Sequence, residues 1–451
     1  MKTIFITIFE GVESKNILRT PIFETLMRRK DIRLVLFTKS QKRAEYHKRE
    51  FNDPRIVYEV VENPKVIGFD WIFRKLKYVL LRTETTKLRR RMDYDMRKNY
   101  ISYRWGDLVN WFCARRTILR VVRILDYHLV RDRVYARYFE KHKPDLIFLA
   151  NLFDEREVHF LREAERHDVK TIGFINTWDR VSARCVLRLL PDRLVVFNDL
   201  VKEELICYDD ADPEQIFVGG IPQYDQYFSL RPSLREEFFR GLGISSATKL
   251  IVYSPIGSAF SNSDWNMMDL LVRLTKEGKF GENIAVLVRF PPNDFIDPKD
   301  LEKRPDLLYT YPGTRFSEKR GVDWDMNFAE LKYLSDTLYH MSLLVCYASS
   351  ISIDAAALDR PVINLNFEVR PHETLSKSPT QFYQMAHYKK AIDTGGIRLV
   401  GSESELIAWV KKYLENPALD REGRKRIVES QCKFTDGKAG ERIASFILNN
   451  L

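Results

Sequence analysis

The sequence lacks a long apolar run, and its cysteines are few and scattered. No stretch of about 18 apolar residues free of charge occurs in the 451 residues, which argues against a transmembrane helix. The apolar segment 2–9 ends at Glu10 and Gly11 with no small-residue cleavage site, so we expect a first β-strand and not a signal peptide. The chain has five cysteines, far apart in the sequence, which predicts neither a disulfide framework nor a structural zinc site. This cysteine usage favours a reducing cytoplasm as the location of the protein.

Several motifs for cofactors and metals are also missing. The chain has no Gly-x-Gly-x-x-Gly, no Gly-x-x-x-x-Gly-Lys-Ser/Thr and no Gly-x-Ser-x-Gly. Asp93-Tyr94-Asp95 has the form of a metal-binding Asp-x-Asp, but it lies in a basic helical stretch and not at a strand end. We therefore expect no metal and no cofactor.

The positive charge is confined to one segment. The whole chain carries a formal charge of +10. Residues 65–143 hold 21 Lys and Arg against 8 Asp and Glu, a net charge of +13, so the other 372 residues carry −3. The same segment is rich in Trp, Phe and Tyr, and basic helices with aromatic residues suit an anionic partner. Three interpretations stay open: apolar helix faces that pack on the protein with solvated Arg side chains, an anionic membrane surface, or nucleic acid.

Strand and helix patterns alternate in two series, which is typical of parallel, doubly wound sheets. The first series has strands near 2–9, 32–38, 55–61, 144–151, 169–176 and 192–198. The second has strands near 248–254, 283–289, 343–348 and 361–365. Gly and Pro cluster at 219–222. We predict an α/β fold with two Rossmann-like domains, residues 1–220 and 221–451, a basic helical insertion at 65–143, and a ligand cleft between the carboxyl ends of the two sheets.

The most informative segment is 345–364, in which a strand ends in hydroxyl side chains and a short Ala-rich helix follows. Ser349, Ser350 and Ser352 stand where free backbone N–H groups at the helix start favour an anion. Asp354 in the first turn is placed either to cap backbone donors or to accept hydrogen bonds from a ribose.

This segment resembles the donor-site region of GT-B glycosyltransferases and of the CDP-glycerol glycerophosphotransferases. Four further stretches agree with those families in order along the chain, over about residues 140–450. They are Trp178-Asp179, the run 191–225 that contains Val218-Gly219-Gly220, the turn 288–292, and Asp436-Gly437-Lys438-Ala439. The resemblance implies that the 345–364 segment holds the diphosphate and ribose of a nucleotide.

The chain departs from the glycerophosphotransferase pattern in two places. The family's Arg-Pro-His-Pro turn is here Arg289-Phe290-Pro291-Pro292, so a histidine is missing near Pro291. The family's Trp-Asp-Asn is here Trp178-Asp179-Arg180. The first departure argues against glycerol-phosphate polymerisation, and the second predicts altered contacts to the acceptor.

Other strand-end residues complete the predicted site. Arg289 ends a strand, and a guanidinium suits a diphosphate. Ser254 and Gly257 lie in a strand-end loop, and His387 lies in a loop region where related enzymes contact base or sugar. Inverting transfer needs a base for the acceptor hydroxyl, and three candidates in the N-terminal domain stay open. These catalytic candidates are Glu10, Asp154 and Asp179, with Gly11 and Trp178 on the acceptor side.

The sequence therefore predicts a metal-independent glycosyltransferase. It would move a sugar from a nucleotide-sugar donor to a glycan or lipid-linked acceptor in surface polysaccharide synthesis, and the basic segment 65–143 would contact an anionic membrane at its cytoplasmic face. The alternatives are a polyol-phosphate transferase of the CDP-glycerol type, a nucleotide-sugar epimerase of the same fold, and a non-enzymatic nucleic-acid-binding protein. The last is disfavoured because the charge is confined to one segment and no nucleic-acid motif is present, so we expect no nucleic-acid partner.

Overall fold

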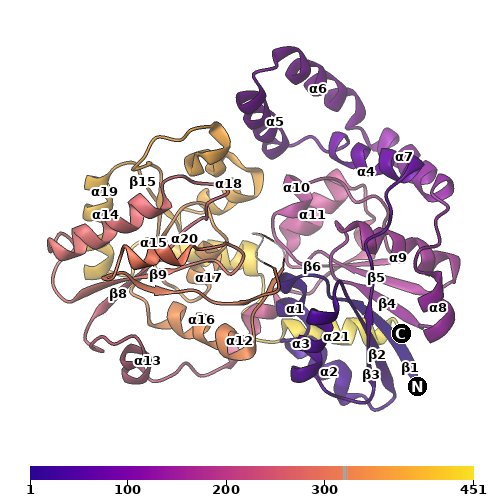
Figure 1. The fold of residues 1–451 in the computed structure, drawn as a ribbon, viewed down its shortest axis with the longest axis horizontal. Helices are drawn as coiled ribbons and strands as arrows, with labels where there is room; N and C mark the ends of the chain where they lie inside the picture. The colour runs from indigo at the N-terminus through magenta and orange to yellow at the C-terminus, as the bar shows by residue number, and fades with distance from the viewer. Residues whose placement is uncertain (318–320, 322) are drawn as a thin grey trace. The chain divides into compact units, whose positions relative to one another are not determined.

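The computed structural model describes all residues except 318–320 and 322, and it divides into two compact units (Figure 1). The first unit comprises residues 1–87, 101–225 and 436–451, and the second comprises residues 88–100 and 226–435. The sequence analysis placed residues 88–100 in the N-terminal domain and residues 221–225 and 436–451 in the C-terminal domain, so these three segments fall in the other unit.

The first unit is built on a seven-stranded parallel sheet. Its strands run in the order β3-β2-β1-β4-β5-β6-β7, and every pairing between neighbours is parallel. In chain order they are β1 (Lys2–Thr7), β2 (Ile32–Thr38), β3 (Ile56–Val60), β4 (Leu146–Leu149), β5 (Lys170–Phe174), β6 (Arg193–Val196) and β7 (Ile216–Val218). The order reverses between β1 and β4, which is the switch point of a doubly wound fold.

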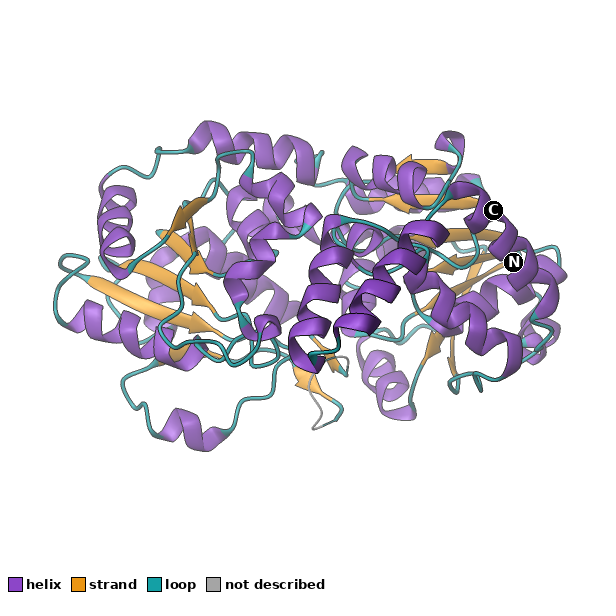
Figure 2. Ribbon diagram, turned by 90° about the horizontal axis from the view of Figure 1, so that it is seen from above, coloured by secondary structure: helices purple, strands orange, loops and turns teal. Residues whose placement is uncertain are grey.

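Helices cover both faces of this sheet (Figure 2). They are α1 (Gly11–Ile17), α2 (Pro21–Arg28), α3 (Gln41–Glu50), α9 (Glu155–Arg166), α10 (Arg180–Ala183), α11 (Asp199–Tyr208) and α21 (Ala439–Asn449). Thr20 caps α2, with its side chain accepting from the Ile22 N–H, and Pro21 stands at the first helical position.

The second unit is built on a six-stranded parallel sheet. Its order is β10-β9-β8-β13-β14-β15, again with a switch point, here between β8 and β13. The strands are β8 (Lys249–Ser254), β9 (Ile284–Arg289), β10 (Leu308–Thr310), β13 (Leu343–Cys346), β14 (Val362–Leu365) and β15 (Arg398–Val400). A small antiparallel pair, β11 (Thr314–Arg315) and β12 (Trp324–Asp325), lies apart from this sheet.

Eight helices of the second unit alternate with its strands or flank them along the chain. They are α13 (Arg235–Gly241), α14 (Asp264–Lys276), α15 (Pro298–Glu302), α16 (Phe328–His340), α17 (Ile351–Ala357), α18 (Ala386–Ile392), α19 (Glu403–Glu415) and α20 (Arg421–Ile427). The short helix α12 (Asp225–Ser229) leads into the unit. Two parallel α/β sheets confirm the predicted fold class.

The basic insertion consists of five helices. They are α4 (Gly68–Val79), α5 (Glu84–Arg97), α6 (Tyr100–Cys113), α7 (Arg116–Leu129) and α8 (Ala136–His142). Most of α5 belongs to the second unit, whereas α4, α7, α8 and nearly all of α6 belong to the first.

Candidate functional site

Each predicted site residue falls within one unit or the other. Glu10, Gly11, Asp154, Trp178 and Asp179 belong to the first unit, and the other eight belong to the second.

In the second unit, the segment after β13 has the predicted form of a strand end followed by a helix. The strand ends at Cys346, and α17 begins at Ile351. Ser349 is half-buried, and Ser350, at the N-cap position, is exposed and makes no capping hydrogen bond with its side chain. Both hydroxyls are therefore accessible to a ligand.

Ser352 has a different environment. Its side chain is fully buried, and its hydroxyl lies 2.9 Å from the Tyr388 hydroxyl and 3.3 Å from the Asn364 side-chain nitrogen. Tyr388 in turn donates to the Asn364 side-chain oxygen at 2.6 Å. These bonds use the Ser352 hydroxyl to connect β14, α17 and α18, so we expect Ser352 to position the loop and not to touch a phosphate.

Asp354 is paired with a tyrosine that the sequence analysis did not select. The Tyr227 hydroxyl donates to the Asp354 carboxylate at 2.6 Å, and both residues are buried. The two residues are 127 positions apart in the chain, which explains why no local pattern revealed this pair. Tyr227 follows the Pro222–Tyr224 turn closely, so the only signal was its position at the start of the second unit.

Arg289 ends β9, and one of its guanidinium nitrogens lacks a hydrogen-bond partner among the described residues. Its side chain is buried, with 6% of the residue exposed, and its Nε has no hydrogen-bond partner among the described residues. Burial lowers the pKa of Arg289, while the nearby Tyr227 and Asp354 act in the opposite direction. Because a buried cation without a hydrogen-bonded counter-ion is costly, this environment favours an anionic ligand.

Two carboxylates, Asp264 and Asp294, accept hydrogen bonds from the loop after β8. Gly257 has φ +96°, where a side chain would be strained, and its N–H donates to Asp264 at 2.7 Å. Ser258 donates to Asp294 at 3.0 Å through both its N–H and its hydroxyl. The Gly257 amide is thus already occupied, whereas Ser254 is buried at the end of β8. We expect Gly257 to shape this loop, and Ser254 stays a predicted ligand contact.

Helix α5 packs against these same loops. Leu88 and Met92 are buried with Phe382, and the half-buried Ile256, Ala348, Leu375 and Met385 surround them. The Asp95 carboxylate accepts a hydrogen bond from the Leu375 N–H at 2.7 Å. The loops that carry Gly257, Ser349 and His387 therefore adjoin a helix from the basic insertion. His387 itself is buried at the start of α18, and its proposed ligand contact stays a prediction.

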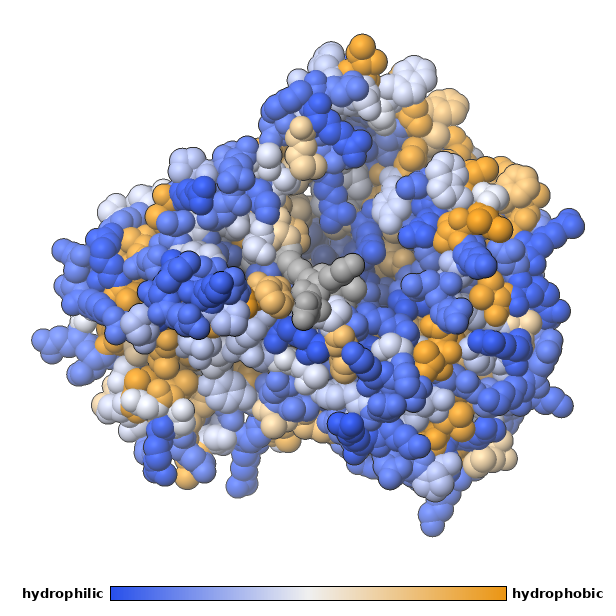
Figure 3. Space-filling model, viewed as in Figure 1, coloured by the Kyte–Doolittle hydropathy of each residue, from blue (hydrophilic) through white to orange (hydrophobic). Residues whose placement is uncertain are grey.

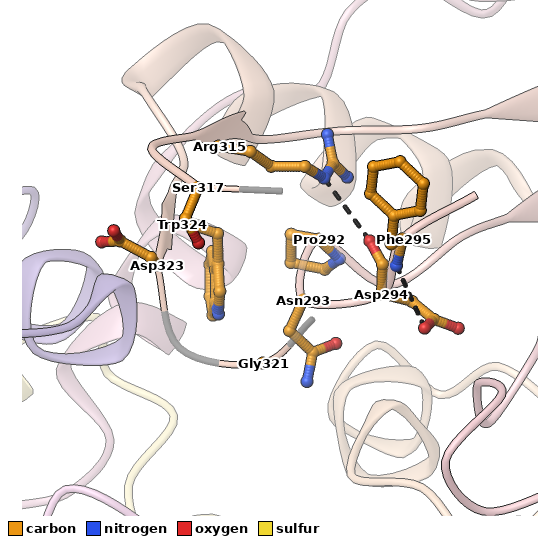
Figure 4. Close-up of a pocket in the computed structure, with 9 residues that line it drawn as sticks. All are labelled: Pro292, Asn293, Asp294, Phe295, Arg315, Ser317, Gly321, Asp323 and Trp324. Carbon is orange, nitrogen blue, oxygen red and sulfur yellow. Dashed lines mark hydrogen bonds between the residues drawn. The ribbon is translucent and has the colours of Figure 1, made fainter. Parts of the chain in front are cut away.

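A pocket that the sequence did not predict follows the 289–292 turn (Figure 4). Its lining consists of Pro292, Asn293, Asp294, Phe295, Arg315, Ser317, Gly321, Asp323 and Trp324. The Arg315 guanidinium lies over the Tyr311 ring at 3.5 Å and donates to the backbone carbonyls of Pro312 and Gly313, each at 3.0 Å. Arg315 is therefore held in the pocket lining by contacts within its own neighbourhood of the chain.

In the first unit, the three predicted catalytic carboxylates differ in exposure and in their ion pairs. Asp154 caps α9 and forms a two-point ion pair with Arg156, at 2.9 and 2.6 Å. Burial acts to raise the pKa of Asp154, but Arg156 lowers it overall. Glu10 and Asp179 are both partly exposed, and Glu10 lies 3.9 Å from the Arg180 guanidinium. Asp154 is thus poorly suited to accept a proton, which leaves Glu10 and Asp179.

Gly11 and Trp178 flank these carboxylates. Gly11 is buried as the first residue of α1, and Trp178 is half-buried in the loop after β5. Their acceptor-side role stays a prediction.

The first unit also holds two fully buried glutamates, Glu13 and Glu157, that the sequence analysis missed. Glu13 accepts from the Glu10 N–H at 2.9 Å and from the Asn151 side chain at 3.0 Å. Glu157 accepts from the Thr7 hydroxyl at 2.6 Å and from the Asn151 N–H at 2.7 Å. Burial, with the charges of Glu10 and Asp154, raises the pKa of Glu13 to about 7, and burial with Glu13 raises the pKa of Glu157 well above its ordinary value. Asn151 also accepts from Arg180 at 2.5 Å, so this acid pair is connected to the Glu10 neighbourhood.

Comparison with known families decides the assignment. Residues 207–449, more than half of the chain, match the sequence profile described as CDP-Glycerol:Poly(glycerophosphate) glycerophosphotransferase. The chain belongs to this glycerophosphotransferase family. Membership confirms the resemblance, and it supports a transferase that takes a sugar or polyol-phosphate group from a nucleotide-activated donor in the synthesis of surface polymers. No curated protein matches this glycerophosphotransferase-family chain by sequence.

Solved structures show the same GT-B fold at low identity. S. aureus MnaA, solved with UDP, is 12% identical, with a TM-score of 0.53 and coverage of 100% of this chain and 98% of that one. The UDP-GlcNAc 2-epimerase of Neisseria meningitidis, bound to UDP-GlcNAc, is 12% identical, with a TM-score of 0.54 and full coverage of both chains. A glycosyltransferase of Rickettsia africae is 12% identical, with a TM-score of 0.50, covering 100% of this chain and 99% of that one.

No helix in the described part of the chain is both long and apolar enough to cross a membrane. The described residues also contain no group of three His, Cys, Asp or Glu placed to hold a metal ion. Independence from metal stays a prediction.

Proposed function

We propose that this family member is a glycosyltransferase that binds the diphosphate of a nucleotide-sugar donor at Arg289. The observation that carries the proposal is the buried Arg289 guanidinium, whose Nε has no hydrogen-bond partner among the described residues. Ser349 and Ser350, at the start of α17, are accessible to donate to the same anion. Asp354, which Tyr227 orients, is the predicted ribose contact.

The reaction would proceed by attack of an acceptor hydroxyl on the anomeric carbon of the sugar. The new bond joins the acceptor oxygen to that carbon, and the bond from the carbon to the diphosphate oxygen breaks. The departing nucleoside diphosphate gains negative charge, which Arg289 stabilises. The acceptor proton would pass to a carboxylate. Of the three predicted candidates, Glu10 and Asp179 are partly exposed, whereas Asp154 is ion-paired with Arg156.

The family description favours a second candidate, transfer of glycerol phosphate or another polyol phosphate from a CDP-linked donor. The same Arg289 site would then hold the CDP diphosphate. Against this candidate, the turn after β9 carries Pro291 where the family motif has histidine. A group that could exchange a proton at that position is therefore absent, and we place sugar transfer first.

We further propose that the acceptor is a glycan or a lipid-linked saccharide, and that the enzyme works at the cytoplasmic face of a membrane. Support for the location comes from the basic segment 65–143, whose net charge of +13 suits an anionic lipid surface.

Donor binding tests the proposal directly. A thermal-shift screen against UDP-, GDP-, CDP-, dTDP- and CMP-linked donors, CDP-glycerol included, should give one class that stabilises the protein. A donor at 100 times its dissociation constant adds about 2.7 kcal/mol. Arg289→Ala should weaken the affinity for that donor by about 10- to 100-fold in calorimetry, because charge-assisted hydrogen bonds contribute about 1.5–3 kcal/mol.

Arg273→Ala is the matched control, since Arg273 is exposed and ion-paired with Glu277 and Glu403. Equal donor affinity in the Arg289→Ala variant and the wild type would remove the proposed site. Stabilisation by CDP-glycerol but by no nucleotide sugar would establish the second candidate.

A further inference from the structure

Arg180 departs from the family pattern in a loop on the predicted acceptor side of the first unit. The chain carries Trp178-Asp179-Arg180 where the family has Trp-Asp-Asn. Arg180 is the first residue of α10, which follows β5, and the residues it contacts follow β1 and β4. These three strands are adjacent in the sheet, and doubly wound sheets bind ligands at the carboxyl edge near the switch point. The Arg180 guanidinium is therefore particular to this chain and stands at an edge suited to a ligand.

A buried hydrogen-bond network holds the Arg180 guanidinium in one orientation. Its Nη1 donates to the side-chain oxygen of Asn151 at 2.5 Å. The Asn151 side-chain nitrogen donates to Glu13 at 3.0 Å, and the Asn151 N–H donates to Glu157 at 2.7 Å. Asn151 and both glutamates are buried, and Glu13 also accepts from the Glu10 N–H at 2.9 Å. Arg180 is therefore oriented before any ligand binds, which lowers the entropic cost of binding.

The charge of Arg180 has no hydrogen-bonded counter-ion among the described residues. Its Nη2 lies 3.9 Å from Glu10 Oε2, which is too long for a hydrogen bond. Arg156, at the same edge of the sheet, is by contrast held by Asp154 at 2.9 and 2.6 Å. The side chains of Arg180 and Glu10 are 16% and 19% exposed, so both are partly accessible. Most N–H donors of Arg180 are thus available to an oxyanion that binds beside the Glu10 carboxylate.

The same edge holds buried polar atoms that lack partners. Asn16 Oδ1, Asn176 Nδ2 and Thr177 Oγ have no hydrogen-bond partner among the described residues. Asn16 lies one turn after Glu13 on α1 and donates to the Asn176 carbonyl at 3.2 Å. Because unpaired buried polar atoms are costly, hydroxyl groups from ordered water or from a ligand would stabilise this edge. Apolar surface is instead prominent over the region where Figure 1 draws α4, α6 and α7 (Figure 3).

Given the proposed transfer to a glycan or lipid-linked saccharide, on which this inference rests, we infer that Arg180 selects an anionic saccharide as the acceptor. The guanidinium would bind a carboxylate or phosphate of the sugar, and Glu10 would accept a hydrogen bond from a hydroxyl of the same sugar. Because the two side chains are 3.9 Å apart, that hydroxyl and the oxyanion must be separated by only a few bonds, as in a uronate or a sugar phosphate. A neutral saccharide would leave the guanidinium without a counter-ion.

Small acceptor fragments test this selectivity without any donor. The full chain is titrated with glucose, glucuronate, glucose 6-phosphate and inorganic phosphate, and the dissociation constants are measured by ligand-observed NMR. We expect glucuronate and glucose 6-phosphate to bind about 10- to 100-fold more tightly than glucose, because a charge-assisted hydrogen bond is stronger than a neutral one. Inorganic phosphate should bind more weakly than glucose 6-phosphate, since it lacks the hydroxyl groups of the sugar.

Three variants assign the preference to the Arg180 guanidinium. Arg180→Asn, which introduces the residue of the family, should bind the anionic sugars no more tightly than glucose. Arg180→Lys should keep part of the preference, because an ammonium retains the charge but not the planar fork. The matched control is Arg193→Asn, since Arg193 is exposed at the start of β6, on the opposite edge of the same sheet. This control should bind like the wild type, and circular dichroism should show that every variant is folded.

Three results would overturn the inference. The first is wild-type protein that binds neither anionic sugar more tightly than glucose. The second is a preference that Arg180→Asn retains in full. The third is inorganic phosphate that binds as tightly as glucose 6-phosphate, which would show an adventitious anion site only. Donor affinity should be the same in Arg180→Asn and the wild type, because Arg289 lies in the second unit. Failure of the proposed donor site would therefore appear in the Arg289→Ala measurements and not in these titrations.

Discussion

At the scale of single residues, Arg289 is buried with an unpaired guanidinium nitrogen among the described residues, an environment that favours a bound anion. Its guanidinium is buried at the end of β9 with an unsatisfied Nε, so the free protein bears a desolvation cost that an anion would offset. The sequence predicted the position and the residue type from a strand-end pattern. It did not predict the burial, nor Tyr227 as the residue that orients Asp354.

The burial of Arg289 predicts that its replacement affects donor affinity and unfolding free energy differently. We expect the ligand-free Arg289→Met variant to be at least as stable as the wild type in urea unfolding, because a side chain of similar length replaces the buried cation. The same variant should lose donor binding in calorimetry. A loss of several kcal/mol of unfolding free energy in the ligand-free variant would instead show that Arg289 is fully satisfied by the protein.

Glu13 predicts a pH dependence of stability. Its pKa is raised from 4.5 to about 7 in the folded protein, so between these values the folded state holds a proton that the unfolded state has released. The stabilising contribution is therefore fully present below about pH 4.5 and is lost as the pH rises through about 7, by up to about 3 kcal/mol.

We expect the unfolding free energy of the wild type, measured in urea from pH 5 to 8, to fall with pH. The Glu13→Gln variant, which mimics the protonated acid, should flatten this dependence, whereas Glu302→Gln at an exposed position should not. A variant profile parallel to that of the wild type would assign the raised proton affinity elsewhere, with Glu157 the first alternative.

At the scale of elements, the alternation of strands and helices was readable because each strand of a covered parallel sheet is a continuous apolar run. The predicted strand 32–38 coincides with β2, and the predicted strand 283–289 ends at Arg289 as β9 does. Helix α5 shows what the pattern could not provide. Its basic sequence predicted a helix of the insertion, but its packing partners, such as Phe382, lie nearly 300 residues later in the chain.

The position of α5 predicts an effect on donor binding. Leu88→Ala would leave a cavity beside Phe382, and we expect a cost of about 2–5 kcal/mol in stability. Because Ile256 and Ala348 in the same cluster adjoin Gly257 and Ser349, donor affinity in calorimetry should also fall several-fold. Leu234→Ala at an exposed position is the control. Unchanged affinity in a folded Leu88→Ala protein would show that α5 does not shape the donor loops.

At the scale of the whole molecule, the chain returns to its first unit at the end. The Phe446 ring of α21 stacks on Phe217 with centroids 4.3 Å apart, and Ile443 and Ile447 are fully buried. Asp225 accepts from the N–H groups of Ala439 at 2.9 Å and Gly440 at 2.7 Å. The first unit is therefore completed by residues that the sequence analysis gave to the C-terminal domain.

This return predicts how fragments behave. A fragment of residues 1–225 should be much less stable than the same fragment with residues 436–451 attached by a flexible linker, since burying each isoleucine contributes about 1.5–3 kcal/mol. Thermal melts followed by circular dichroism compare the two. Equal melting temperatures would show that α21 is dispensable for the first unit.

The sequence by itself determined the fold class, the strand-end positions of Arg289 and Ser349, and the concentration of charge in residues 65–143, because all three depend on local periodicity and composition. Only the tertiary structure decided which side chains are buried together. It paired Tyr227 with Asp354, joined Glu13 to Glu157 through Asn151, and turned the aromatic side chains of α6 outward while burying Asp70 and Asp126. Those outcomes depend on contacts between residues distant in the chain. Local sequence does not predict which distant side chain will pair with a buried charge.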